Sequence, residues 1–136
     1  MLVKDAMSNS VVTLTTEESL RDVLNLLRSH RIRHLPVVEG AKVVGIVTDR
    51  DVKRATPSVL SGVERDQYDR VLVETKVAQF MTREPMTVTP TTRLKAAVKI
   101  FIDRKVGALP VVDDGRLVGI LTEIDVMRVA HDLLPD

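Results

Sequence analysis

The feature that most constrains the fold is a duplication with constant spacing. Residues 34–54, HLPVVEGAKVVGIVTDRDVKR, return as residues 108–128, ALPVVDDGRLVGILTEIDVMR, 74 positions later. Met7 with Met81 and Leu20 with Leu94 keep the same offset, so the two copies align without a gap. Self-similarity at a fixed period indicates a repeated structural unit, so the chain is expected to fold as two similar halves.

The repeat divides the 136 residues into a first motif at 1–56, a connector at 57–76 and a second motif at 77–136. The connector, PSVLSGVERDQYDRVLVETK, has no counterpart in the second copy. It opens with Thr56-Pro57, which disfavours continuation of a helix because the residue before proline avoids helical angles. Its second half, RDQYDRVLVETK, could form a further helical piece.

The first part of each copy predicts a short strand and then a helix. The β-branched runs 11–14 and 86–89 predict the strands. Thr16, followed by two glutamates, predicts a helix start. Apolar residues at i, i+3, i+4 and i+7 then predict one amphipathic helix in each copy: Leu20, Val23, Leu24 and Leu27 in the first, and Leu94, Ala97, Val98 and Phe101 in the second.

The second part of each copy predicts a hairpin and a closing helix. The strands are 34–38 with 42–48 and 108–112 with 116–122, with turns at Gly40 and at 113–115. Residues 49–55 and 123–134 predict the closing helices. Since one unit of about 55 residues buries its own core poorly, we expect an α+β fold of two β-α-β-β-α motifs packed by pseudo-twofold symmetry.

Composition favours a folded domain and excludes several partners. Hydrophobic residues make up 44%, whereas 20 Lys and Arg against 19 Asp and Glu leave a net charge of +1. That balance gives no basic field for nucleic acid or for an anionic membrane. The chain has no cysteine, no signal-peptide pattern at its beginning and no apolar run near the roughly 20 residues that span a bilayer. We therefore expect a cytoplasmic protein that binds neither nucleic acid nor membrane.

The main candidate functional segments are the two junctions Thr48-Asp-Arg-Asp51 and Thr122-Glu-Ile-Asp125, where a predicted strand ends in a hydroxyl and carboxylates. Each resembles a capping box, in which the threonine accepts from a free helix N–H and the aspartate accepts from the N–H of the threonine. Capping alone would explain why these residues recur.

The same geometry also suits a nucleoside phosphate. Free N–H groups at a helix start and a threonine hydroxyl can donate to a phosphate, and a carboxylate can accept from the paired hydroxyls of a ribose. Gly45 and Gly119, which lack a Cβ, allow another backbone or a ligand to approach closely. One candidate site is therefore expected in each copy.

The doubled motifs HLPVVEGAKVVGIVTDRDV and ALPVVDDGRLVGILTEIDV, each preceded by Met-Ser or Met-Thr, resemble a pair of cystathionine-β-synthase (CBS) domains. The resemblance covers roughly 3–56 and 77–133 and is closest to stand-alone prokaryotic CBS-pair proteins, some of them acetoin-utilisation-like. It implies a Bateman module, a non-catalytic pair that requires no cofactor. Such modules bind AMP, ADP, ATP or S-adenosylmethionine in clefts between the copies and often form homodimers.

The resemblance also assigns residues. The ribose-binding aspartates fall on Asp51 and Asp125, and the hydroxyl of the Gly-x-x-Thr-x-x-Asp pattern falls on Thr48 and Thr122. The adenine-facing positions fall on Ile32, Arg33 and His34 in one copy and on Val106, Gly107 and Ala108 in the other. The polar residue after the first methionine falls on Ser8 and Thr82.

The two copies differ in charge around these positions. The first copy has Arg33, His34, Arg50 and Lys53 where the second has Gly107, Ala108, Ile124 and Met127. Because charge-assisted hydrogen bonds are the strong ones, we expect tighter phosphate binding near the first copy. The alternative is that these cations are ordinary solvated surface charges.

Three classes of function compete. The leading hypothesis is a ligand-binding regulatory module that acts in trans on a protein target, because this chain contains no effector domain. The second is an interaction-only dimerisation module that has lost its ligand sites. An enzyme is disfavoured because no nucleophile motif, no Walker or Gly-x-Gly-x-x-Gly loop and no metal-ligand cluster is present. We therefore assign no catalytic and no metal-binding residue.

Overall fold

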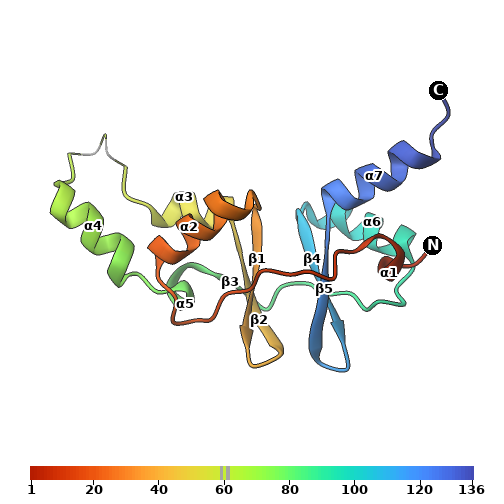
Figure 1. Ribbon diagram of the computed structural model, residues 1–136, viewed down its shortest axis with the longest axis horizontal. Helices are drawn as coiled ribbons and strands as arrows, with labels where there is room; N and C mark the ends of the chain where they lie inside the picture. Colours follow the sequence, from red (N-terminus) through yellow and green to blue (C-terminus); the bar gives the residue numbers. More distant parts are fainter. Residues whose placement is uncertain (59, 61) are drawn as a thin grey trace. The chain divides into compact units, whose positions relative to one another are not determined.

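The computed structural model describes residues 1–58, 60 and 62–136. Its helices and strands, labelled in Figure 1, are α1 (Val3–Ala6), α2 (Leu20–His30), β1 (His34–Glu39), β2 (Lys42–Thr48), α3 (Asp49–Ala55), α4 (Arg65–Glu74), α5 (Val77–Phe80), β3 (Thr82–Arg83), α6 (Leu94–Arg104), β4 (Ala108–Asp113), β5 (Arg116–Thr122) and α7 (Glu123–Leu133). The predicted amphipathic helices, hairpin strands and closing helices are confirmed.

The chain divides into two compact units whose limits do not follow the repeat. Unit 1 contains Met1–Val11, Ala41–Val43 and Pro85–Asp136, and unit 2 contains Val12–Gly40 and Val44–Glu84. Unit 1 thus holds the second copy's long helix and hairpin together with the first residues of the first copy. Unit 2 holds the first copy's long helix together with the connector and the first residues of the second copy.

Backbone hydrogen bonds hold each leading segment in the other copy's unit. In unit 2, the N–H of Val77 donates to Glu18 O at 2.8 Å and the N–H of Leu20 donates to Thr75 O at 2.9 Å. In unit 1, Val3 N donates to Thr92 O at 2.8 Å and Leu94 N donates to Met1 O at 2.9 Å. These bonds are related by the same 74-residue offset as the sequence repeat. The short elements they position, α1, α5 and β3, were not predicted.

The cores of the two units use equivalent residues. Unit 2 buries Leu14, Leu20, Val23, Leu35, Val37, Val47, Val52, Leu72 and Val77 in one cluster. Unit 1 buries Val3, Val88, Leu94, Ala97, Leu109, Val111 and Leu121, each at the repeat position of a residue in the first set. Val3 and Val77, which come from the leading segments, are completely buried. Each core is therefore completed by a residue from the other copy.

The sheets are small hairpins that support the junctions. β1, β2 and β3 are neighbours in that order in unit 2, and β4 pairs with β5 in unit 1. The turns lie where predicted, with positive φ angles at Gly40 (62°), Asp114 (51°) and Gly115 (78°). Glycine relieves the steric cost of that conformation at two of these positions.

The predicted strands at 11–14 and 86–89 are wrong as strands. Each is reduced to one parallel bridge, Leu14 with Val37 and Val88 with Val111. To extend this parallel pairing toward residue 12, the backbone N–H of residue 36 would have to donate to the carbonyl of residue 12. Residue 36 is proline, which has no N–H. Pro110 blocks the second copy in the same way, so the ladder ends after one residue.

The predicted helix start at Thr16 is also wrong. The helix begins at Leu20, and its N-cap is Ser19, whose hydroxyl accepts from Asp22 N at 3.1 Å. Ser19 N donates in turn to Asp22 Oδ2 at 2.9 Å, which completes a capping box. The carbonyls of Thr16 and Glu18 instead accept from the leading segment of the second copy. Residues 16–18 are therefore held by tertiary hydrogen bonds, although their local preference predicts a helix start.

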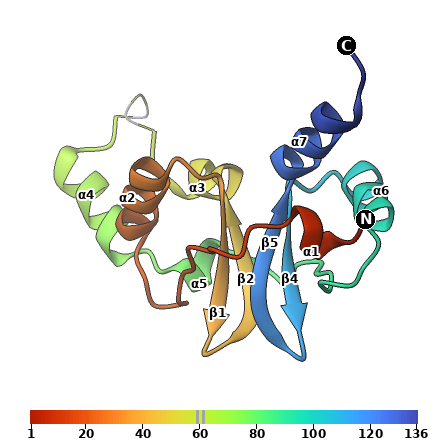
Figure 2. The same cartoon turned by 45° about the vertical axis from the view of Figure 1, so that its right-hand side comes forward.

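The helical piece expected in the connector is confirmed as α4, which packs against α2 (Figures 1 and 2). Leu72 of α4 is buried in the core of unit 2, and Tyr68 packs against that core. Arg21 of α2 forms an ion pair with Asp69 of α4 at 3.6 Å. The connector is thus part of unit 2.

A methyl group at Gly119 should destabilise unit 1. A Cβ there would lie 2.8 Å from Ser8 O and 2.9 Å from Met7 Sδ, and the Ser8 carbonyl is fixed by its hydrogen bond from Ile120 N. We expect Gly119→Ala to lower the free energy of unfolding by about 1–3 kcal/mol, measured by urea denaturation. A loss below about 0.5 kcal/mol would mean that the leading segment does not lie against β5.

Glu18 should make stability depend on pH. Burial raises the pKa of its carboxyl and the Asp22 carboxylate adds to the rise; Oε2 has no hydrogen-bond partner among the described residues. Because the folded-state pKa lies above the unfolded one, ionised Glu18 destabilises the fold. This penalty is absent below the unfolded pKa of about 4.3 and complete above the folded pKa.

Glu18→Gln should therefore be more stable than the parent at pH 7, and the difference should shrink as the pH falls to about 3.5, measured by thermal melts at both pH values. A difference that stays constant with pH would show that Glu18 does not titrate differently in the folded chain.

Candidate functional site

The junction between β2 and α3 has the predicted capping box. Thr48 Oγ1 accepts from Asp51 N at 3.3 Å, and Thr48 N donates to Asp51 Oδ2 at 3.0 Å. These two bonds satisfy backbone donors that the helix start would otherwise leave unpaired. They also fix the Asp51 side chain in one orientation.

Asp51 has a second partner from the other copy. Thr82 Oγ1 lies 3.3 Å from Asp51 Oδ1 and 3.2 Å from Asp51 Oδ2, so its hydroxyl donates to the carboxylate. Asp51 exposes 8% of its surface and is the charged residue that is buried within the described part of the chain. A buried carboxylate needs such donors, because desolvation without them is costly. Thr48 and Thr82 therefore hold the Asp51 side chain in one orientation.

Strand β3 positions Thr82 next to Asp51. Ile46 of β2 pairs with Thr82, and Gly45 pairs with Arg83. A Cβ on Gly45 would lie 2.6 Å from Met81 Sδ and 3.0 Å from Thr82 O. The close approach expected at this glycine is therefore made by the protein's own backbone and methionine.

A surface pocket of about 450 Å³ opens at Asp51. Its lining residues, all in unit 2, are Asp51, Arg54, Ala55, Thr75, Gln79, Phe80, Met81 and Thr82. The pocket thus combines a carboxylate, a guanidinium, hydroxyl and amide groups and an apolar wall. Its size lies within the range of small-molecule clefts, which is roughly 300–1,000 Å³.

Arg54 was not among the predicted site residues. It lies one helical turn after Asp51, on the same face of α3, and its side chain forms no ion pair or hydrogen bond with any described residue. The signal was present in the repeat, because arginine follows the aspartate by three positions in both copies, as Arg54 and Arg128. Residues at i and i+3 of a helix are neighbours.

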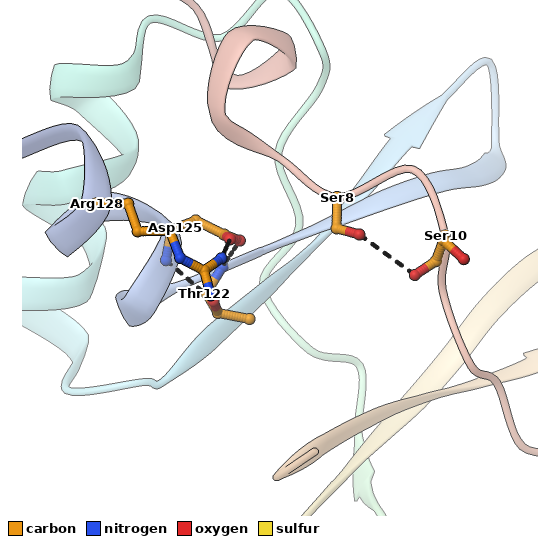
Figure 3. A network of polar contacts seen from close by, with 5 residues as sticks. All are labelled: Ser8, Ser10, Thr122, Asp125 and Arg128. Atoms are coloured by element: carbon orange, nitrogen blue, oxygen red, sulfur yellow. Dashed lines mark hydrogen bonds and ion pairs between the residues drawn. The ribbon is translucent and has the colours of Figure 1, made fainter. Parts of the chain in front are cut away.

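The junction in unit 1 has the same cap but different neighbours (Figure 3). Thr122 N donates to Asp125 Oδ2 at 2.8 Å and Asp125 N donates to Thr122 Oγ1 at 3.3 Å. Arg128 Nη1 lies 3.5 Å from Asp125 Oδ1 and forms an ion pair with it. Ser8, at the repeat position of Thr82, bridges to Ile120 of β5, but its hydroxyl donates to Ser10 O at 3.3 Å. Asp125 is therefore paired with a cation where Asp51 is paired with a hydroxyl.

The adenine-facing segments lie at the start of the same helices. Asp49 N donates to Arg33 O, and Glu123 N donates to Gly107 O, both at 3.1 Å. Within these segments Ile32, His34, Val106 and Gly107 are half-buried and Ala108 is buried. The side chains of Arg33, Arg50 and Lys53 are exposed and do not line the pocket at Asp51.

Two features are absent among the described residues. No group of three or more His, Cys, Asp or Glu side chains in the described chain is placed to hold a metal ion. None of the helices formed by the described residues combines the length and apolar character needed to cross a membrane.

A model of the CBS domain matches residues 3–58 and again 77–132. This chain belongs to the CBS domain family. The resemblance inferred from the doubled motifs is thereby confirmed, and the α+β fold of paired CBS motifs is shared with solved CBS pairs.

Similar sequences include a CBS domain-containing protein of Dictyostelium discoideum, 35% identical over 98% of this chain and 94% of that protein. Inosine-5′-monophosphate dehydrogenase of Korarchaeum cryptofilum is 38% identical over 89% of this chain, which spans only 23% of the enzyme. The match to an enzyme is thus confined to its CBS part.

Solved structures with the same fold include CBSX2 in complex with AMP, with a TM-score of 0.81 and 29% identity over 98% of this chain and 99% of that one. CBSX2 is a CBS-pair protein from Arabidopsis thaliana. Another CBS domain pair, solved with 5′-methylthioadenosine and S-adenosyl-L-methionine, has a TM-score of 0.79 and 29% identity over 96% of this chain and 99% of that one. A protein from Vibrio cholerae assigned to acetoin utilization has a TM-score of 0.80 and 30% identity over 98% and 92%.

Truncation of the two aspartates should cost different amounts of stability. Asp51→Ala removes the cap and leaves the Thr82 hydroxyl without its partner, whereas Asp125→Ala removes the cap and one ion pair with Arg128, whose side chain is 74% exposed. Since such an ion pair contributes little and a hydrogen bond to a charged group contributes more, we expect Asp51→Ala to cost about 1 kcal/mol more. Urea denaturation of both variants measures the difference, and equal losses would contradict the assigned role of Thr82.

Proposed function

We propose that this CBS pair is a non-catalytic regulatory module that binds an adenosyl ligand, with the pocket at Asp51 as its main site. The observation that carries the proposal is the buried Asp51 carboxylate, held by Thr48 and Thr82 at the edge of a pocket that also presents Arg54. The AMP and S-adenosylmethionine complexes of CBS pairs with the same fold support this ligand class.

Each pocket residue has a role that follows from its chemistry. Asp51 accepts hydrogen bonds from the two ribose hydroxyls, because an ionised carboxylate is an acceptor only. Thr48 and Thr82 orient it, and Thr82 can rotate its hydroxyl toward a ligand. Arg54 donates to a phosphate or carboxylate in a planar, bidentate manner. Arg33, Arg50 and Lys53 remain the predicted additional cations for a longer phosphate chain.

The site at Asp125 is proposed as the weaker of the two. Arg128 already pairs with Asp125, so a ribose must compete with that ion pair for the carboxylate. Thr122 caps the helix as Thr48 does, but Ser8 directs its hydroxyl to Ser10. The adenine-facing residues of this copy, Val106, Gly107 and Ala108, bring no cation.

Signalling by the module would pass to another molecule. A ligand changes an equilibrium between two shapes only by its difference in affinity for them. We propose that the chain forms a cytoplasmic homodimer and that a protein target reads its shape in trans.

One observation favours the interaction-only alternative. Ile124 and Met127 of α7 expose 58% and 63% of their surface, and they stand at the repeat positions of Arg50 and Lys53. Exposed apolar side chains on one helix are typical of a protein contact. If no adenosyl compound binds, this helix is the part of the chain that best explains its function.

Isothermal titration with AMP, ATP and S-adenosylmethionine tests the proposal. We expect Asp51→Asn to weaken binding of the preferred ligand at least tenfold, because a neutral amide replaces the charged acceptor of the ribose hydroxyls. Asp22→Asn is the matched control, since Asp22 fills the same position in the capping box of α2 and lies outside the pocket. It should bind with the parent affinity.

Two outcomes would contradict the proposal. Absence of binding by all adenosyl compounds would favour the interaction-only module. Equal loss of affinity in Asp51→Asn and Asp22→Asn would indicate that helix capping, and not contact with the ligand, makes Asp51 important.

A further inference from the structure

A second hollow lies on α6 and shares no lining residue with the pocket at Asp51. It has a volume of about 500 Å³, and its lining residues are Arg93, Lys95, Ala96, Val98, Lys99 and Ile102. All of them belong to one helix and its N-cap, so within the described chain no other element lines this surface. Ile102 exposes 69% of its surface. The result is an apolar strip bordered by three cations.

The repeat shows what covers the equivalent surface in unit 2. Lys95 and Val98 of α6 stand at the positions of Arg21 and Leu24 of α2. There, Arg21 pairs with Asp69 of α4 at 3.6 Å, and Leu24 packs against the cluster that contains Leu72 of α4. Figures 1 and 2 show α4 alongside α2 in both views.

Helix α4 has apolar and acidic residues at the spacing that this surface of α2 can bind. Its apolar residues Tyr68 and Leu72 are spaced i, i+4 and reach the core of unit 2, and Asp69 reaches the cation of α2. Asp66 adds a negative charge to its first turn. Helix α4 is therefore amphipathic: its apolar residues pack against unit 2, and beside them Asp69 forms an ion pair with Arg21.

In the second copy, the surface of α6 has the same kinds of residues as the α2 surface that contacts α4, with an added cation at Lys99 and an added apolar side chain at Ile102. The cation at the position of Arg21 is kept as Lys95, Asn25 is replaced by Lys99, and Arg28 is replaced by Ile102. The α6 surface is thus more basic beside the strip and more apolar within it. Lys99 Nζ pairs with Asp103 of the same helix at 3.0 Å, but both side chains are largely exposed, so this ion pair costs little to give up. Burial of exposed apolar area and charge attraction to Lys95 and Lys99 therefore both favour an acidic amphipathic helix.

We propose that this face of α6 binds an acidic amphipathic helix of a partner protein, in the way that α4 lies on α2. The occupant is not α4 of a second copy, because Tyr68 and Leu72 of α4 are already packed within their own unit. The partner helix presents apolar residues at i, i+4 with an acidic residue at i+1. No residue of this surface lines the proposed nucleotide site.

The α4 helix of this chain supplies the probe. A fluorescent peptide of residues 64–75, made helical by a side-chain lactam because a free peptide of this length is mostly unfolded, is titrated with the full-length protein in the absence of nucleotide. Fluorescence anisotropy should show saturable binding that weakens as salt rises. Lys95→Glu combined with Lys99→Glu should weaken it at least tenfold.

Matched controls separate this surface from others. Arg28→Glu reverses a charge on α2, at the repeat position of Ile102, and should leave peptide binding unchanged. A peptide in which Asp66 and Asp69 are replaced by lysine should lose binding to the parent. Circular dichroism checks that the Lys95 and Lys99 variant stays folded, as expected for exposed substitutions.

Three results would overturn the proposal. One is no saturable binding of the helical peptide. The second is binding that does not respond to reversal of Lys95 and Lys99 or to reversal of the peptide's acids. The third is tight binding of phosphatidylserine vesicles through Lys95 and Lys99 without binding of the peptide, which would make the surface a lipid contact.

Discussion

The fold depends on the exchange of two leading segments between the copies of the repeat. Val77 enters the core built around the first copy's helix, and Val3 enters the core built around the second copy's helix; both are completely buried. Backbone bonds such as Val77 N to Glu18 O fix the register of the exchange. Neither half is complete without residues from the other, which explains why the copies occur together. The exchange also delivers Thr82 to Asp51, and so it builds the candidate site.

At that site, helix capping and the proposed ligand binding are complementary roles of the Asp51 side chain. The Asp51 carboxylate closes the helix start through Thr48 and still faces a pocket with Arg54. The cap preorganises the carboxylate, so a ligand need not order it. In the second copy the same cap is present, but Arg128 engages the carboxylate. The two aspartates thus have the same backbone cap but different side-chain partners. Asp51 is bonded by the Thr82 hydroxyl, whereas Asp125 is paired with the Arg128 guanidinium.

Residues with local causes were predictable from the sequence. The apolar stripe beginning at Leu20, the turn at Gly40 and the capping boxes at Thr48 and Thr122 follow from spacing and side-chain chemistry alone. Features that arise from long-range pairing were missed. The helix does not start at Thr16 as predicted, because the Thr16 carbonyl accepts a hydrogen bond from Ala78 N instead. The predicted strand at 11–14 is only a single bridge, because Pro36 has no N–H to extend the pairing. Arg54 was missed because it gains its meaning only from the pocket beside it, although its spacing from Asp51 was visible. The roles assigned to the ligand-binding residues stay predictions.

The contact between Thr82 and Asp51 joins the exchange of segments to the candidate site, so a double-mutant cycle on this pair tests the account most directly. The free energy of unfolding is measured for the parent, Thr82→Val, Asp51→Ala and the double variant, with urea as denaturant. The account predicts a coupling energy of about 0.5–3 kcal/mol, the range for residues in one hydrogen-bond network. Additive losses, with a coupling energy near zero, would contradict it, because Thr82 and Asp51 would then not act together in the folded chain.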